Sequence, residues 1–490
     1  MIKTGIIGSG FSSLSAACYL AKEGYEVHVF EQHDQAGGRA RTFSAEGFVF
    51  DMGHSWYWMP DVFEKFFNDF GKKTEDYYSL KRLDPSYNVY FNNSEVEIPA
   101  NLEQLKNLFE SWEPGSAEAL DDFLEEARFK YHLGMDNIVL KPGKSITEFF
   151  DAEVLSGVLK MHVFKSFDAY TKKFFKDERI LKLLEFPILF LGATAQTTPA
   201  LYSLMNYADI KLGTWYPMGG MHKIVEGMQS LAEELGVHFH FNTQVEQIHI
   251  VKGHIQGLAL KDKGIFALDA VVAGADYHFV ETKLLPKPYR QYSESYWGSR
   301  QMAPSALIFY LGINKRIEGL HHHTLFFDEE FALHAEEIYT HPKWPEKPLF
   351  YVCAPSVTDA TVAPVGSENI FILMPLAPGI EDTESLREQY YSILMERMEK
   401  RMGQSIAKHV AFKRSYAIND FVSDYNAFKG NAYGLANTLK QTAIFKPSIL
   451  NKKVSGLFYT GQLTVPGPGV PPAIISGKIA ANELIKSHQL

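Results

Sequence analysis

Apolar and polar residues near the start of the chain follow two different periods. Residues 2–7 are mostly apolar and predict a short buried strand. Apolar residues then recur at helical spacing from Leu14 to Leu20, and Gly24 marks the end of this helix. Residues 27–30 form a second apolar run and predict another buried strand. The order strand, helix, strand is typical of a unit that opens a parallel sheet.

Similar patterns predict elements along the rest of the chain. Residues 60–200 are expected to be mainly helical. Helical spacing predicts helices over residues 103–108, 119–130, 224–235, 386–402 and 473–484. Apolar runs predict strands over residues 237–241, 245–250, 255–260, 270–276, 306–311, 369–374 and 456–460. No apolar run approaches the roughly 18 residues needed to span a bilayer, and the N-terminus shows no signal-peptide pattern.

Composition narrows the class of protein. The length of 490 residues corresponds to two or three domains. An apolar content of 46% and a charged content of 22% exclude disordered and fibrous classes. The net charge of −10 argues against nucleic acid as a partner. The only cysteines, Cys18 and Cys353, are too few for a disulfide framework or a Cys-based zinc site, and they fit a reducing interior.

A glycine-rich turn joins the first predicted strand to the first helix. Gly8 permits the tight turn, and Gly10 lets a pyrophosphate approach the backbone. The free N–H groups at the helix N-terminus favour phosphate. Glu31, about 20 residues further on, can accept hydrogen bonds from both hydroxyls of a ribose. Ser13 replaces the usual third glycine and is small enough for close packing of helix and strand. The pattern predicts a dinucleotide site.

The segment after Glu31 indicates which dinucleotide. Glu31 followed by Gly37-Gly38-Arg39 resembles the two-part signature of the flavin amine oxidase and phytoene desaturase superfamily. In that superfamily the diglycine and the arginine lie against FAD, so the resemblance implies FAD as cofactor. Residues 50–55 continue the pattern. Many relatives have proline where His54 stands, and its role is left open.

Later segments extend the resemblance over the whole chain. Residues 216–221 (Tyr-Pro-Met-Gly-Gly-Met) resemble a stretch near the flavin and substrate, and residues 466–472 resemble the loop that closes the FAD site. The chain most resembles the bacterial-type phytoene desaturases, which are carotenoid desaturases. The resemblance implies that FAD is bound by Gly8, Gly10, Phe11, Ser12, Glu31, Gln32, Gly38, Arg39, Ala40, Gly53, Ser55, Val245, Gly461, Gln462 and Val470. No catalytic residue and no metal ligand is predicted.

The predicted fold is α/β. A discontinuous Rossmann-like FAD-binding domain is expected to consist of residues 1–60, 213–290 and 450–490. An interleaved α+β substrate domain with a helical membrane-associating region is expected over residues 61–212 and 291–449. The abundant Phe and Tyr residues are candidates for lining a polyene channel, or are ordinary core.

A basic amphipathic stretch lies within residues 158–192. Residues 160–182 carry seven basic and three acidic side chains. Apolar residues share one helical face, namely Leu159, Val163, Phe167, Tyr170 and Phe174. This pattern is typical of a helix lying on anionic lipid, and equally of a surface helix packed on a core. It predicts peripheral association with the inner face of the cell membrane, from the cytoplasm.

The triplet His321-His322-His323 suggests a metal site at first sight. Consecutive side chains point in different directions on a helix or strand, and no further ligands stand at metal-binding spacing. The triplet is therefore interpreted as a solvated loop.

Four functions remain open. The leading hypothesis is desaturation of phytoene towards lycopene, with FAD accepting hydride and a quinone or oxygen reoxidising it. The second is 3,4-desaturation of hydroxylated carotenoids. An amine oxidase is more remote, because those enzymes usually place aromatic residues in the last loop, which here reads Pro-Gly-Pro-Gly-Val-Pro-Pro. A flavin-free protein that escorts lipidated partners is disfavoured by the intact glycine turn and Glu31.

Overall fold

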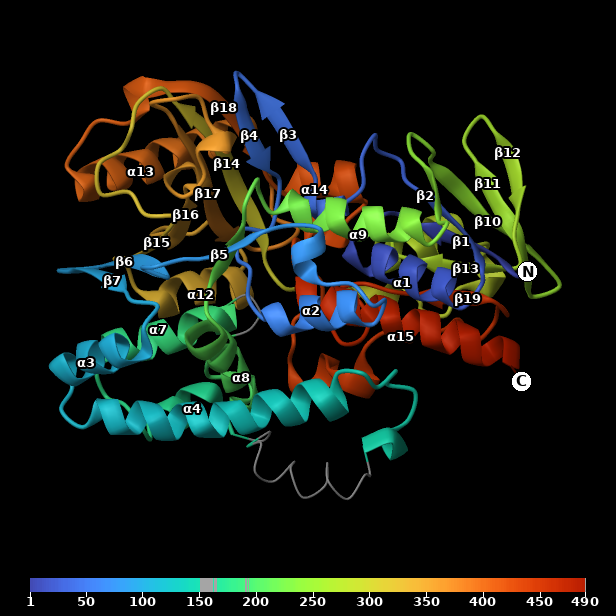
Figure 1. Cartoon of the computed structure of the whole chain (residues 1–490), viewed down its shortest axis with the longest axis horizontal. Helices are drawn as coiled ribbons and strands as arrows, with labels where there is room; N and C mark the ends of the chain where they lie inside the picture. Colours follow the sequence, from blue (N-terminus) through green and yellow to red (C-terminus); the bar gives the residue numbers. More distant parts are fainter. Residues whose placement is uncertain (150–161, 163–164, 190–191, 193, 490) are drawn as a thin grey trace.

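A five-stranded parallel sheet joins the two ends of the chain to a middle segment. The computed structural model describes residues 1–149, 162, 165–189, 192 and 194–489 (Figure 1). The strand order is β19-β13-β1-β2-β9. The strands are β1 (Lys3–Ile7), β2 (Glu26–Phe30), β9 (His238–His240), β13 (Ala270–Ala273) and β19 (Leu457–Tyr459). Each is short. Four of them are almost fully buried, as expected for strands covered on both faces, whereas β9 at the sheet edge is partly exposed.

Three helices flank this sheet: α1 (Phe11–Lys22), α9 (His222–Glu234) and α15 (Val470–Gln489) (Figure 1). Helix α15 approaches α1 very closely, because a Cβ atom at Gly477 would lie only 2.1 Å from the carbonyl oxygen of Ser12. Ser13 is fully buried, and a Cβ atom on Gly274 would lie 2.0 Å from its Oγ. The small residues Ser13 and Gly274 therefore allow the start of α1 to lie close to the end of β13.

A seven-stranded sheet forms the second layer, in the order β18-β14-β17-β16-β15-β6-β7. Its strands are β6 (Tyr87–Phe91), β7 (Glu95–Ile98), β14 (Ser305–Ile313), β15 (His323–Phe327), β16 (Phe350–Cys353), β17 (Glu368–Leu376) and β18 (Val410–Tyr416). Alternate residues of β14 face opposite sides: Leu307 and Phe309 pack in the cluster with α13 (Glu384–Met402), whereas Ile308 and Tyr310 belong to the central core. Figure 1 shows α13 on the outer side of this sheet.

Helices α3 (Leu102–Trp112), α4 (Ser116–Leu133), α7 (Glu178–Leu189) and α8 (Leu204–Asn206) form a third region, which lies below the seven-stranded sheet in Figure 1. The short helix α6 (Phe167–Thr171) precedes α7, and α2 (Pro60–Asn68) lies beside α1 and α15. Helices α12 (Phe331–Tyr339) and α14 (Ile418–Tyr425) pack near the seven-stranded sheet. Among the helices of the described residues, none is both long enough and apolar enough to cross a membrane.

Smaller sheets complete the fold. They are β3 (Thr42–Ala45) with β4 (Phe48–Asp51), β5 (Leu80–Arg82) with β8 (Trp215–Pro217), and β10 (Val245–Val251) with β11 (His254–Leu260) and β12 (Gly264–Ala267). The predicted β-α-β start and the later predicted helices are confirmed within a few residues. The expectation of a mainly helical segment over residues 60–200 is partly wrong, because β5, β6 and β7 lie within it. Strand β6 is fully buried and lies between β15 and β7.

The predicted amphipathic helix is not continuous where the structure describes it. Helix α6 has only five residues, and a turn separates it from α7. Tyr170 is 1% exposed, and its ring lies 5.9 Å from that of Phe123 on α4, while the Phe174 ring lies 5.6 Å from the same phenylalanine. The apolar face of this part thus packs on the protein core. Leu159 and Val163 lie outside the described residues.

Candidate functional site

The turn between β1 and α1 leaves open space in front of the helix N-terminus. Gly8 has φ of +85°, which favours glycine. A Cβ atom added to Gly10 would meet no heavy atom within 4 Å, so space is open in front of this residue. Gly10 is the N-cap of α1, and no side chain caps the helix. The first backbone N–H groups of α1 are therefore available to an anion.

Glu31 lies at the end of β2, beside this turn. Its side chain is 4% exposed. Oε2 accepts hydrogen bonds from the Ser9 backbone at 2.9 Å and the Ser9 hydroxyl at 2.6 Å, and Oε1 accepts one from the His33 backbone at 2.9 Å. A carboxylate has about four acceptor positions, so these bonds fix its orientation and leave capacity for a further donor.

A cavity follows the turn, Glu31 and the start of β10. It lies beside twelve of the predicted FAD residues: Gly8, Gly10, Phe11, Ser12, Glu31, Gln32, Gly38, Arg39, Val245, Gly461, Gln462 and Val470. Gly53 and Ser55 instead line a second, neighbouring cavity. Ala40 lines neither. It is buried, and its carbonyl oxygen accepts a hydrogen bond from His222 Nδ1 at 2.8 Å. Ala40 therefore contacts the first residue of α9 and not a cavity.

The second cavity is large and mostly apolar. Its free space is about 2230 Å³, counting the part open to solvent. Aromatic and aliphatic side chains such as Trp56, Trp58 and Phe63 form much of its lining. Arg39 and Lys141 are the only Lys, Arg, Asp or Glu residues among the lining residues that the structure describes. The cavity suits a long apolar ligand.

The two cavities share six lining residues: Arg39, His54, Tyr425, Gln462, Gly469 and Val470. Arg39 Nη2 donates to the Asn431 carbonyl at 3.3 Å, but its Nε has no partner among the described residues, and neither does the buried Nδ1 of His54. Unsatisfied buried nitrogens of this kind call for a ligand or water. The junction therefore fits a polar group that borders the apolar cavity.

His54 is uncharged at neutral pH. Burial disfavours its charged form, and the Arg39 guanidinium adds repulsion, so the pKa of His54 is lowered to about 4. Its ring meets Phe11 edge-on, with centroids 5.6 Å apart. The neutral imidazole can offer a hydrogen bond at the junction without adding charge to the apolar cavity.

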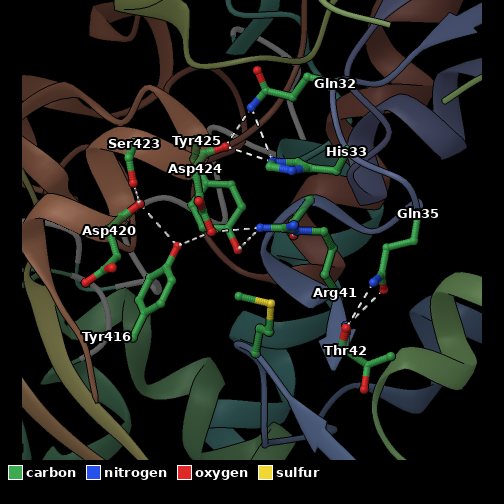
Figure 2. A network of polar contacts seen from close by, with 12 residues as sticks. Gln32, His33, Gln35, Arg41, Thr42, Tyr416, Asp420, Ser423, Asp424 and Tyr425 are labelled. Atoms are coloured by element: carbon green, nitrogen blue, oxygen red, sulfur yellow. Dashed lines mark hydrogen bonds and ion pairs between the residues drawn. The ribbon is translucent and has the colours of Figure 1, made fainter. Parts of the chain in front are cut away.

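Helix α14 brings Tyr425 to the junction and Asp424 to the first cavity, and neither residue belongs to a sequence motif. Arg41 binds Asp424 through an ion pair of 2.9 Å, and the Gln32 amide donates to the Asp424 carbonyl at 2.7 Å (Figure 2). The Arg39 guanidinium lies 5.0 Å from the centre of the Tyr425 ring. These contacts hold Tyr425 at both cavities. The glycine motif could not predict that α14 belongs to this site, because α14 follows almost 400 residues later in the chain.

The interpretation of the histidine triplet as a solvated loop is wrong for two of its members. His322 is 5% exposed and His323 is fully buried at the start of β15. His323 pairs with Cys353 across the β15–β16 ladder. The strand pairing, which the sequence did not indicate, takes both rings into the core.

Comparisons with known proteins agree on one family. The model of the family described as flavin containing amine oxidoreductase matches residues 11–485. The carotenoid 3,4-desaturase of Haloarcula japonica is 37% identical over 484 residues, covering 98% of this chain and 97% of the relative. The zeta-carotene-forming phytoene desaturase of Myxococcus xanthus is 30% identical, covering 98% and 93%. The crystal structure of an oxidoreductase from Methanosarcina mazei has the same fold, with a TM-score of 0.61 at 18% identity, covering 97% of this chain and 99% of that one.

Proposed function

The chain belongs to the family of flavin-containing amine oxidoreductases, and from this premise we propose that it uses FAD to desaturate a carotenoid. The observation that carries the proposal is the apolar cavity that meets the glycine turn's cavity at six shared residues. A carotenoid is a long hydrocarbon, which such a cavity binds by burying apolar surface. The names of relatives that cover nearly the whole chain support the same substrate class.

The residues of the first cavity fit FAD. Gly8 and Gly10 would hold the pyrophosphate at the start of α1, and Glu31 would accept a hydrogen bond from a ribose hydroxyl. Arg39 and His54, each with an unpartnered buried nitrogen, would face the flavin ring at the junction. We propose that residues 1–60, 213–290 and 450–490 form this FAD-binding unit, with the remaining segments around the substrate.

The chain itself contributes positioning of the substrate. Bound FAD supplies the hydride acceptor. The aromatic lining of the second cavity would hold an allylic CH₂ against the junction, and a polyene can delocalise the positive charge that develops. No carboxylate lines the cavity within the described residues, and His54 is a weak base because of its low pKa. We therefore assign no base, and the proton is expected to leave to water.

Phytoene, desaturated stepwise towards lycopene, is the first proposed substrate. A hydroxylated carotenoid desaturated at the 3,4 position is the second, favoured by the 37% identity to a carotenoid 3,4-desaturase. Asn437 and Thr442 in the lining of the apolar cavity can hydrogen-bond a hydroxyl group.

Product analysis distinguishes these substrates. The FAD-loaded protein is incubated in liposomes that contain either phytoene or a hydroxylated carotenoid, and the products are separated by chromatography. We expect products with a longer conjugated system from one of the two, and none from protein stripped of FAD. Release of hydrogen peroxide from amines, with no conversion of either polyene, would show the proposal to be wrong.

We also propose that the protein binds peripherally to the inner face of the cell membrane, where its substrate is dissolved, and passes electrons to a quinone or oxygen. Phe445 supports this, because it is 58% exposed and lies two residues from Ala443, which lines the apolar cavity. The exposed Lys173 and Lys176 would meet anionic headgroups.

A further inference from the structure

Three potential metal ligands meet inside the seven-stranded sheet, outside the lining of both cavities. His322 precedes β15, His323 is its first residue, and Cys353 is the last residue of β16. All three are buried. Each offers one ligand atom, and these atoms all lie within 4.8 Å of one another.

The hydrogen bonds of the two imidazoles leave one nitrogen of each ring free. His322 Nδ1 lies 2.7 Å from the Thr358 hydroxyl, and His323 Nδ1 lies 2.6 Å from the Tyr351 hydroxyl. The Nε2 atoms of both rings are buried and have no hydrogen-bond partner among the described residues. With Nδ1 donating its proton to the hydroxyl, Nε2 keeps its lone pair.

This arrangement matches the surroundings of a metal ion better than those of a packed core. Metal-binding histidines almost always donate their second ring N–H to a neighbouring oxygen, as both rings can here. Buried nitrogens without partners are otherwise costly. Imidazole and thiolate together favour Zn²⁺ and Cu⁺ over hard cations.

We propose that His322, His323 and Cys353 bind one thiophilic transition-metal ion, Zn²⁺ or Cu⁺. Bonds of about 2.0–2.3 Å put ligand atoms roughly 3.3–3.8 Å apart, so a separation at the 4.8 Å limit would close by about 1 Å on binding. Cys353 binds as a thiolate and releases its proton. A mixed site of this kind needs only one cysteine, so the low cysteine content does not exclude it.

The metal would support the wall of the apolar cavity. The ring of His323 stacks on that of Trp56, with centroids 4.0 Å apart, and its Nδ1 meets Tyr351. Trp56 and Tyr351 both line the apolar cavity. The ion would fix these two rings without contacting a ligand in the cavity. This proposal does not depend on which substrate the cavity holds.

Metal content of the purified flavoprotein tests the site. The protein is freed of metal, titrated separately with Zn²⁺ and with Cu⁺ under reducing conditions, and analysed by elemental mass spectrometry. We expect about one equivalent of one of these ions. Cys353→Ser and His323→Gln should lower the affinity at least 100-fold, and Thr358→Val should lower it 10- to 100-fold by freeing the His322 ring.

Cys18→Ser is the matched control, because Cys18 is the other buried cysteine and contacts the Met228 carbonyl in a different part of the core. It should bind metal like the wild type, and flavin absorbance checks the fold of every variant. The proposal is wrong if the wild type takes up neither ion, or if Cys18→Ser and Cys353→Ser bind equally well. Thr358→Val keeps the test valid if either ligand variant fails to fold.

Discussion

Glu31 is the residue whose role is most sharply defined. Its carboxylate is held by the Ser9 backbone and hydroxyl and by the His33 backbone, beside the start of α1. Glu31→Ala removes the proposed acceptor for the ribose, and a hydrogen bond to a charged group contributes about 1.5–3 kcal/mol. We expect the affinity for FAD to fall at least tenfold, measured by adding FAD to the cofactor-free protein.

Glu23→Ala is the matched control for Glu31→Ala, because Glu23 is an exposed carboxylate just after α1. It should leave FAD binding unchanged. Equal affinity of the Glu31→Ala protein and the wild type, with both folded by circular dichroism, would contradict the role assigned to Glu31.

At the residue scale, the sequence predicted the site residues that belong to one local motif. Gly8, Gly10 and Glu31 lie within 24 residues of one another, and their spacing alone brings them to one recess. Tyr425 reaches the same site through the Arg41–Asp424 ion pair (Figure 2). No local pattern records such a contact between distant segments, so sequence reasoning missed it.

Between elements, the close packing of α1 and α15 controls the geometry of the cofactor site. Gly477→Ala improves helix propensity but places a Cβ atom 2.1 Å from the Ser12 carbonyl, which is backbone and cannot move alone. Overpacking of this kind costs about 1–3 kcal/mol. We expect a lower Tm and weaker FAD retention, because α1 must shift away from α15.

Gly298→Ala provides the comparison for Gly477→Ala. Gly298 ends the helix α11 (Glu294–Gly298), and an added Cβ atom there meets nothing within 4 Å. Its Tm should stay close to that of the wild type. A Gly477→Ala protein as stable as Gly298→Ala would show that α15 can move away from α1 at little cost.

The amphipathic stretch shows why periodicity alone could not decide between two environments. Phe167 and Tyr170 share one face, as the sequence predicted, but that face meets Phe123 on α4. Core and lipid both select apolar side chains on one face of a helix. Only the position of the neighbouring helix α4 shows that this face packs on the core.

Across the whole molecule, three distant segments build one parallel sheet, with β19, β13 and β1 side by side. The motif residues stand near both ends and in the middle of the chain, and the sequence predicts a discontinuous FAD-binding unit on that basis. No sequence motif indicates which strands pair in the seven-stranded sheet. The burial of His322 and His323 depends on that pairing, which is why the sequence placed them in a loop.

Membrane binding is a property of the molecular surface, and charge reversal tests it. Lys172 is paired with Asp168 at 2.6 Å, whereas Lys173 and Lys176 are exposed at the helical region. Each lysine near an anionic surface contributes about 1 kcal/mol. Lys173→Glu with Lys176→Glu adds repulsion to this loss and should therefore weaken binding to anionic liposomes by at least about 2 kcal/mol, or 30-fold, in sedimentation assays at low salt.

The double variant Lys400→Glu with Lys408→Glu changes the net charge by the same amount. Lys400 lies in α13, on the outer side of the seven-stranded sheet and away from the helical region, and Lys408 follows that helix (Figure 1). If the helical region is the face that binds the membrane, this double variant should bind liposomes like the wild type. Equal weakening of both double variants would mean that only net charge matters, and no weakening of either would leave the lysines without a role at the membrane.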